Sequence, residues 1–231
     1  MKKATFVIAI LLLALARSAQ ADFAQTFTTG FQNEGVIPDG SMTGWSDTRS
    51  LVGAAGAISD VSVTLNLSGG WNGDLYAYLV HNNGFAVLLN RVGVSSGSSS
   101  GYGNGGMNVV LSGAGSGGNI HWYGGAGVSS GPYQPDGRNI DPRSPGGTLA
   151  GTTPSALLSS FNGQSASGNW TLFVADVSGG DVSTVTSWGL DIAAVPEPAS
   201  LVEGSLAVLV LGGAIGLYRL KGPKVQPQPR C

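Results

Sequence analysis

The segment from Ala57 to Leu67 constrains the fold of this chain more than any other stretch. Its apolar residues recur at every second position and are separated by small polar ones. In an extended strand, this period places all apolar side chains on one face and all polar side chains on the other. Such a strand is typical of an antiparallel sheet with one face on a core and one face in water. The apolar positions are Val61, Val63, Leu65 and Leu67.

Other segments extend this pattern to the rest of the chain. Glycine provides 38 of the 231 residues, a composition that favours turns and short strands over helices. Residues 74–81 are apolar on both faces, so we expect that strand to lie centrally in its sheet. Asn82-Asn83-Gly84 predicts a hairpin turn, because Asn-Gly supplies positive φ angles. The remaining expected strands are 22–29, 85–90, 107–111, 120–123, 169–177 and 184–192.

Loops are expected between these strands. Residues 30–47 are turn-rich, with a tight turn at Pro38-Asp39-Gly40. Residues 93–118 are a low-complexity Gly/Ser stretch, and residues 124–147 contain four prolines, which predicts a long loop. Residues 153–161 are expected to include a helical turn, with Thr153 as the N-cap.

The five tryptophans divide into two groups. Trp170 and Trp188 occupy alternating apolar positions in the last two expected strands. We expect both in the core, where each would bury about 150–250 Å²; the alternative is a platform on which a sugar stacks. Trp45, Trp71 and Trp122 lie in or beside glycine-rich turns and are expected to be exposed. Trp71 is the strongest candidate for an aromatic side chain that faces a ligand.

Residues 1–21 have the pattern of a secretory signal peptide. Lys2 and Lys3 precede an apolar stretch at 4–16, and Ala19 and Ala21 form a small-x-small cleavage site. This pattern predicts transport through the Sec translocon and cleavage after Ala21. The alternative, an uncleaved membrane helix, fits less well because the apolar stretch is short.

The last segment, residues 195–231, carries three signals in a fixed order. Pro196, Glu197 and Pro198 come first, and prolines end a preceding strand. Residues 201–218 are an apolar run with one charge, Glu203. Its length is near the lower limit of about 17–25 residues for a transmembrane helix. The basic residues that follow predict a cytoplasmic tail.

This ending resembles the PEP-CTERM sorting signal of Gram-negative bacteria. The resemblance implies a transient anchor in the inner membrane, with Pro196, Glu197 and Pro198 as the motif recognised by an exosortase. It also implies that the processed product is delivered to the cell surface or to an exopolysaccharide matrix. The basic residues are more dispersed here than in the family, and Glu203 interrupts the apolar run. An ordinary C-terminal anchor without a sorting enzyme is the alternative.

Between the two ends, residues 22–194 are long enough for one domain with a core. This segment has four arginines, no lysine, ten aspartates and one glutamate, a formal charge of −7. An acidic domain repels phosphate backbones, so nucleic acid is not expected as a partner. The only cysteine is Cys231, which excludes a disulfide and a thiolate metal site in the domain. His81 and His121 are too few for a typical histidine zinc site.

Two groups of short motifs resemble the P/Homo B domain found beside the protease of subtilisin-like proprotein convertases. The first group is Ile58–Leu67 followed by Gly73-Asp74-Leu75. The second is Phe161-Asn-Gly163, the Gly-x-Trp-x-Leu segment Gly168–Asp176, and Ser187-Trp-Gly-Leu190. The resemblance implies a jelly-roll, galactose-binding-like β-sandwich. The Gly/Ser-rich middle of the chain does not align with the family, and no protease domain accompanies the segment.

Asp74, Asp176 and Asp181 are the candidate site residues of this domain. Asp74 and Asp176 fall at positions that match the family, and Asp181 follows in the next turn. One role is structural, in which a carboxylate accepts hydrogen bonds from loop N–H groups. The other is calcium binding, since calcium prefers several hard oxygen ligands. Both roles remain open from the sequence.

Several enzyme motifs match by composition alone. Residues 93–97 and 127–131 fit the Gly-x-Ser-x-Gly nucleophile pattern, and residues 101–106 and 113–118 fit a dinucleotide fingerprint. None of them lies on an expected strand-to-helix turn, which both motifs require. We therefore expect a non-enzymatic, exported cell-surface or extracellular-matrix protein that acts by adhesion or by association with exopolysaccharide. The alternative is a calcium-dependent carbohydrate-binding module, and a hydrolase is a more distant third.

Overall fold

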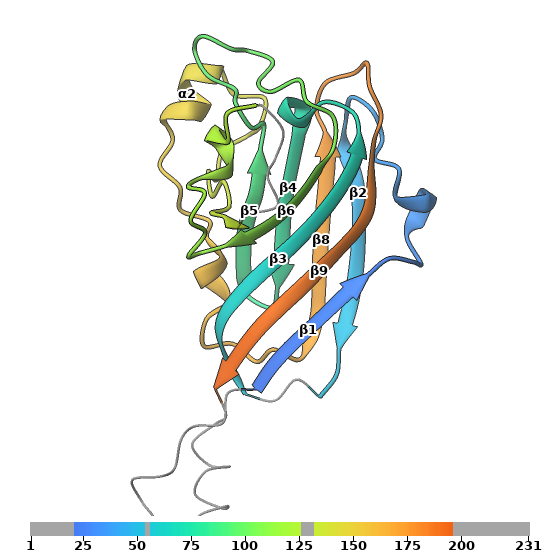
Figure 1. Cartoon of the computed structure of the whole chain (residues 1–231), viewed down its shortest axis with the longest axis vertical. Helices are drawn as coiled ribbons and strands as arrows, with labels where there is room; N and C mark the ends of the chain where they lie inside the picture. The colour runs from blue at the N-terminus through green and yellow to red at the C-terminus, as the bar shows by residue number, and fades with distance from the viewer. Residues whose placement is uncertain (1–20, 54–55, 126–131, 196–231) are drawn as a thin grey trace, which may run out of the picture. The chain divides into compact units, whose positions relative to one another are not determined.

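The computed structural model of the chain describes residues 21–53, 56–125 and 132–195. These residues form two β-sheets that face each other, as Figure 1 shows. The described helices are short: α2 (Gly146–Gly151) and the 3₁₀ helices η1 (Gln32–Gly35), η2 (Asn72–Asp74), η3 (Ile120–Trp122) and η4 (Leu158–Phe161). The strands are β1 (Ala21–Phe27), β2 (Ser41–Leu51), β3 (Ala57–Gly69), β4 (Leu75–His81), β5 (Gly84–Asn90), β6 (Met107–Ser112), β7 (Pro132–Tyr133), β8 (Gly168–Asp176) and β9 (Ser183–Val195).

Strand pairing confirms the expected all-β sandwich. One sheet has the order β1-β9-β3-β6-β7 and the other the order β2-β8-β4-β5. All pairs are antiparallel except β6 with the two-residue strand β7. Strand β4 lies between β8 and β5, so the predicted central position of residues 74–81 is confirmed.

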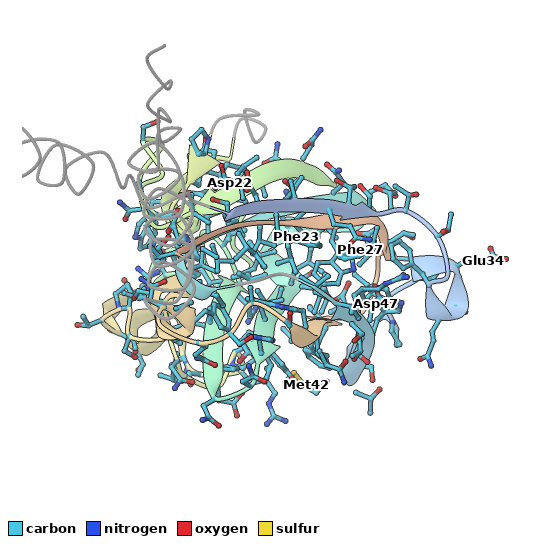
Figure 2. All side chains as sticks on the ribbon, turned by 90° about the horizontal axis from the view of Figure 1, so that it is seen from below. Asp22, Phe23, Phe27, Glu34, Met42 and Asp47 are labelled. Atoms are coloured by element: carbon cyan, nitrogen blue, oxygen red, sulfur yellow. The ribbon has the colours of Figure 1, made fainter. Side chains whose placement is uncertain are left out.

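The core lies between the sheets and contains one large tryptophan from each. Trp170 of β8 and Trp188 of β9 are both fully buried, which confirms the core role expected for them. The alternating apolar residues of β3 are buried as well, in agreement with the period of its sequence. In Figure 2, the labelled side chains of Phe27 and Asp47 lie between the two layers. Apolar burial on this scale is the main force that holds two sheets together.

Two predictions of local structure were wrong, and a third was right in part. Residues 30–47 were expected to be turn-rich, but residues 41–47 belong to the eleven-residue strand β2. Residues 120–123 were expected as a strand and contain the 3₁₀ helix η3, where Asn119 caps the backbone N–H of His121. Residues 153–161 do include a helical turn, the 3₁₀ helix η4, but its N-cap is Leu157 and not Thr153. The α-helix α2 was not predicted.

Trp45 is also a correction, because it was expected to be exposed and only 4% of it is accessible. Strand β2 turns its side chain toward the core, where its ring meets that of Phe31 edge to face at 5.4 Å. The indole N–H donates to the backbone oxygen of Gln32 over 2.9 Å. The polar end of the ring is therefore satisfied inside the protein.

The two terminal signals fall mostly outside the described residues. Ala19, Pro196, Glu197, Pro198 and the apolar run 201–218 are all in undescribed segments. Ala21 begins β1 and pairs with Ala194, while β9 continues to Val195, the first residue of the predicted sorting segment. Within the described part of the chain, no helix has the length and apolar character needed to span a membrane.

Candidate functional site

Four carboxylates gather at one end of the four-stranded sheet. Asp176 ends β8 and stands opposite Leu75, the residue that follows Asp74. Asp181 lies in the β8–β9 loop, and Asp39 lies in the turn before β2. The backbone N–H of Gly180 donates to both carboxylate oxygens of Asp39 at 3.1 Å, which joins these two loops. The structure thus brings the three predicted site residues together and adds Asp39, which the sequence did not indicate.

Asp176 is the most deeply buried member of this carboxylate cluster, with 1% of it accessible. Its Oδ1 accepts the backbone N–H of Ser178 at 3.2 Å, whereas Oδ2 has no hydrogen-bond partner among the described residues. Burial is the main cause that raises the pKa of Asp176 to about 6; the hydrogen bond from Ser178 opposes this rise, and the carboxylates of Asp74, Asp39 and Asp181 contribute to it. A buried carboxyl group surrounded by like charges favours its neutral form.

Asp74 is held differently, because a cation lies beside it. Arg91 Nη2 is 3.5 Å from Asp74 Oδ1, and the same guanidinium donates to the backbone oxygens of Gly73 and Ser99. Burial nevertheless raises the pKa of Asp74 above its usual value, because it outweighs the lowering effect of Arg91. The backbone oxygen of Asp74 accepts the N–H of Val177, which ties η2 to the end of β8.

This geometry bears on the two roles left open by the sequence. The hydrogen bonds of Asp39, Asp74 and Asp176 to neighbouring loops fit the structural role. Within the described residues, no group of three or more His, Cys, Asp or Glu side chains is arranged to hold a metal ion. The unpartnered Oδ2 of Asp176 is the one feature of the cluster that suits a cation, since a buried anionic oxygen needs a counter-charge.

A second polar group, which the sequence did not predict, lies inside the long loops. His121 Nδ1 is 2.7 Å from Asp136 Oδ2, and Arg138 Nη1 donates to Asp136 Oδ1 at 3.0 Å. All three side chains are buried. Asn119 supports them, because its amide donates to the backbone oxygens of Pro135 and Asp136. This network joins the loop segments 119–122 and 135–138.

The same network bears on the hydrolase alternative, because His121 lies beside the Gly-x-Ser-x-Gly match at 93–97. An Asp–His pair beside a serine has the composition of a catalytic triad. However, His121 Nε2 faces the backbone oxygen of Val94 at 2.9 Å, while Nδ1 faces Asp136. Both ring nitrogens are therefore engaged with oxygen acceptors, and neither is directed at the hydroxyl of Ser95 to accept its proton. The geometry favours a structural role for this histidine.

His81 also has a structural environment. It is fully buried, and its ring nitrogens lie 2.9 Å from the backbone oxygen of Asn169 and 2.7 Å from that of Ser165. Its ring stacks on Trp170 with 3.9 Å between centroids and 3° between planes. The imidazole thus fastens β4 to the segment that leads into β8.

Trp71 is the predicted ligand-facing aromatic, and 38% of it is exposed. It precedes η2, and its ring lies so close to Gly103 that a Cβ there would come within 2.6 Å of it. Trp122 is exposed to a similar degree, at 48%, with the guanidinium of Arg138 5.7 Å from its ring centroid. Both predictions of exposure are confirmed.

The outer face of the four-stranded sheet carries a group of aromatic residues in contact with one another. Tyr78 of β4 stacks on Phe173 of β8 at 4.6 Å and also contacts Tyr76 and Phe85. All four rings are partly exposed. Burial raises the pKa of both Tyr76 and Tyr78, so their hydroxyl groups stay protonated over a wide range of pH. The signal was present in the alternate tyrosines of residues 74–81.

No family model and no curated protein matches this sequence. The solved structures that resemble the chain include a serine protease of Aeromonas sobria in complex with the chaperone ORF2, and the same protease alone. The first has a TM-score of 0.43 and 17% identity, and covers 82% of this chain and 30% of the other. The second has a TM-score of 0.44 and 16% identity, and covers 80% and 29%. The chain thus spans less than a third of the protease, and a likeness this distant assigns neither family nor activity.

Proposed function

We propose that this chain is a non-enzymatic, exported cell-surface or extracellular-matrix protein that acts by adhesion or by association with exopolysaccharide. The observation that carries the proposal is the order of its parts: an export signal at 1–21, a β-sandwich, and the Pro196-Glu197-Pro198 sorting motif ahead of an apolar run and basic residues. A Gram-negative cell would export it through the Sec translocon, hold it briefly in the inner membrane and process it by an exosortase.

The features of the body support a role in contact with polymers. The described sandwich exposes hydroxyl, amide and aromatic side chains, and residues 22–194 contain no lysine. An acidic surface is compatible with neutral polymers and repels polyanions such as nucleic acids. We propose that the sandwich belongs to the jelly-roll, galactose-binding-like class of the P/Homo B domain. In support, the Gly-x-Trp-x-Leu segment forms β8, the neighbour of the Asp-Leu segment that opens β4.

The location is tested by removing Pro196, Glu197 and Pro198 in the native host. The deletion should trap the protein in the inner membrane fraction, whereas the unaltered chain should reach the cell surface or the matrix. An in-frame deletion of Gly113 and Ala114, two exposed turn residues that follow β6, provides the control for folding. Equal delivery of both deletion variants would refute the sorting proposal.

The second candidate function is a calcium-dependent carbohydrate-binding module. The observation that favours it is the buried, unpartnered Oδ2 of Asp176 next to the carboxylates of Asp74, Asp39 and Asp181. Carboxylate oxygens are the hard ligands that calcium prefers, and calcium would relieve the repulsion among them, although no three of the described carboxylates are already arranged around a metal position. In this alternative Asp74, Asp176 and Asp181 would supply oxygen ligands, with loop carbonyl oxygens completing the shell.

Calorimetry and thermal melts with calcium test this candidate. A module of this kind should release or absorb heat with calcium and melt at a higher temperature in its presence. Asp176→Asn should abolish both effects, whereas Asp60→Asn, at an exposed position on β3, should retain them. A melting temperature of the unaltered chain that is unchanged by millimolar calcium would rule the candidate out.

A further inference from the structure

A shallow groove of about 580 Å³ crosses the outer face of the five-stranded sheet, where β9, β3 and β6 lie side by side (Figure 1). Four polar side chains from these three strands line it: Asn66 and Ser68 from β3, Asn108 from β6 and Thr186 from β9. The register places Asn66 opposite both Asn108 and Ser187, so the two amides are neighbours across strands. Cross-strand neighbours on one face lie about 4.5–5.5 Å apart.

Glycine backbone forms one wall of this groove and is held in place by buried contacts. Gly106 donates its N–H to the backbone oxygen of Gly69 over 2.8 Å. A Cβ at Gly105 would lie 2.8 Å from the backbone oxygen of Gly70, so only glycine permits this approach. Asn72, which is fully buried, donates its amide to the backbone oxygen of Gly106 at 2.9 Å. The wall is therefore a fixed part of the fold.

The chemistry of the lining selects one class of ligand. Every residue that lines the groove is uncharged, and its polar side chains are amides and hydroxyls. Each amide offers donors and an acceptor, as each hydroxyl does, which matches the alternating hydrogen bonds of a sugar ring. Asn66 is already oriented, because its Nδ2 donates to Ser187 Oγ at 2.6 Å and Thr186 donates to its backbone oxygen at 3.1 Å. An anionic polymer would find no cationic side chain in this lining.

Trp71 adds an aromatic surface to the same region. It follows Gly69 and Gly70, and its ring packs against Gly103, two residues before the glycine wall. The backbone N–H of Asn72 donates to the oxygen of Asn104, so the loops that carry Trp71 and the wall are hydrogen-bonded to each other. Trp71 does not line the groove itself, but its partly exposed indole stands on the loop bonded to the glycine wall. There it would provide the apolar contact that the C–H face of a pyranose ring needs, while the amides bind its hydroxyls.

We propose that this groove is a binding site for a neutral polysaccharide, with Asn108, Thr186 and Ser68 as hydrogen-bonding residues and Trp71 as the stacking residue. The inference rests on the proposed function and deepens it, because it assigns polymer association to one surface and one ligand class. The site is independent of the carboxylate cluster and needs no calcium.

Affinity electrophoresis of the full-length protein in detergent tests the proposal, with dextran, galactomannan and mixed-linkage β-glucan as neutral probes and alginate as the anionic probe. At least one neutral polysaccharide should retard the protein, and alginate should not. Asn108→Ala, Thr186→Val and Trp71→Ala should each weaken retardation by about fivefold or more, as the loss of one hydrogen bond or ring contact predicts. Asn169→Ala is the matched control, an exposed asparagine on the outer face of the other sheet.

The outcomes separate this inference from the proposed function. If a neutral polysaccharide retards the protein and the three variants bind like Asn169→Ala, the groove is not the site although polymer association stands. If no neutral probe retards the protein, the groove proposal is overturned, while delivery to the cell surface is decided separately by the sorting-motif deletion. Binding should persist in EDTA. Loss of binding in EDTA would indicate that the carboxylate cluster, and not the groove, is the binding site.

Discussion

The indole N–H of Trp188 donates to the carboxylate of Asp47 over 2.7 Å between the two sheets. Trp188 belongs to β9 and Asp47 to β2, so this bond joins the five-stranded sheet to the four-stranded sheet across 141 residues of sequence. The same oxygen, Asp47 Oδ2, accepts Arg49 Nε at 2.7 Å. A buried carboxylate with two such donors is satisfied, and it forms a polar link between the two sheets inside the core.

Removal of this carboxylate should destabilise the protein substantially. Asp47→Ala leaves the indole N–H of Trp188 and the Nε–H of Arg49 without their acceptor, and we expect the free energy of unfolding to fall by about 2–4 kcal/mol. Asp47→Asn should cost less, because its amide oxygen still accepts from Trp188. Urea denaturation of both variants measures the difference. Asp60→Ala, at an exposed position of β3, is the control, and an equal loss in all three variants would contradict the polar link.

The same pair explains why β2 was not predicted. Side chains directed toward the core in β2 include Trp45, Asp47 and Leu51, so a charged residue stands where alternation requires an apolar one. Trp188, the hydrogen-bond partner of Asp47, is 141 residues away in sequence, so no local pattern indicates that the buried carboxylate will have a donor. Strands β3, β4, β8 and β9 were predictable, because their buried positions are apolar and their period of two is visible locally.

Gly84 has a role that differs from the one its turn sequence suggested. Within the Asn82-Asn83-Gly84 hairpin, Asn82 adopts the positive φ of 48°, whereas Gly84 already pairs with His81. What requires glycine there is packing, because a Cβ would lie 2.2 Å from the ring of Phe161, which is fully buried. Sequence alone does not reveal this contact, since it depends on where η4 packs against β5.

Gly84→Ala should therefore destabilise the fold by overpacking. We expect a loss of about 1–3 kcal/mol in the free energy of unfolding, since the buried ring of Phe161 has little room to move. Gly113→Ala is the matched control, because a Cβ there meets nothing within 4 Å. In the background of Phe161→Leu, the cost of Gly84→Ala should fall. A cost that is unchanged in that background, measured by a double-mutant cycle, would show that the contact is not the cause.

The candidate carboxylate site was predictable in part. Asp74, Asp176 and Asp181 were selected from motif positions in the sequence, and the pairing of β4 with β8 explains why the first two are close. Asp39 was missed because its loop reaches the cluster only through the hydrogen bonds from Gly180. The glycine wall beside Trp71 was equally hidden, because it depends on loops that are more than thirty residues apart in sequence.

The raised pKa of Asp176 predicts a stability that depends on pH. Its pKa is about 6 in the folded protein against an ordinary value of 3.8, so the folded state binds its proton more tightly. Protonation of Asp176 therefore stabilises the folded state. This contribution to the free energy of unfolding is complete below about pH 4 and is lost as the pH rises through 6, with an upper limit of about 3 kcal/mol. Asp176→Asn, in EDTA, should flatten that part of the profile and raise the melting temperature at pH 7. An unchanged slope between pH 4 and 7 in the variant would contradict the assignment, and Asp60→Asn is the control.

The buried His121–Asp136–Arg138 network predicts that one carboxylate holds the long loops together. Asp136→Asn keeps the shape of the side chain but removes the charge that faces both Arg138 and His121, which leaves a buried guanidinium without its counter-ion. We expect a loss of about 3–5 kcal/mol, as for other broken buried pairs. Limited proteolysis should show faster cleavage within residues 119–140 than elsewhere in the body. Asp141→Asn is the control, because it removes only an exposed ion pair: the side chain of Asp141 is 51% accessible and that of Arg143 is 66% accessible. This variant should be cleaved at the same rate as the unaltered protein. If both variants are cleaved at the same rate, the network does not secure these loops.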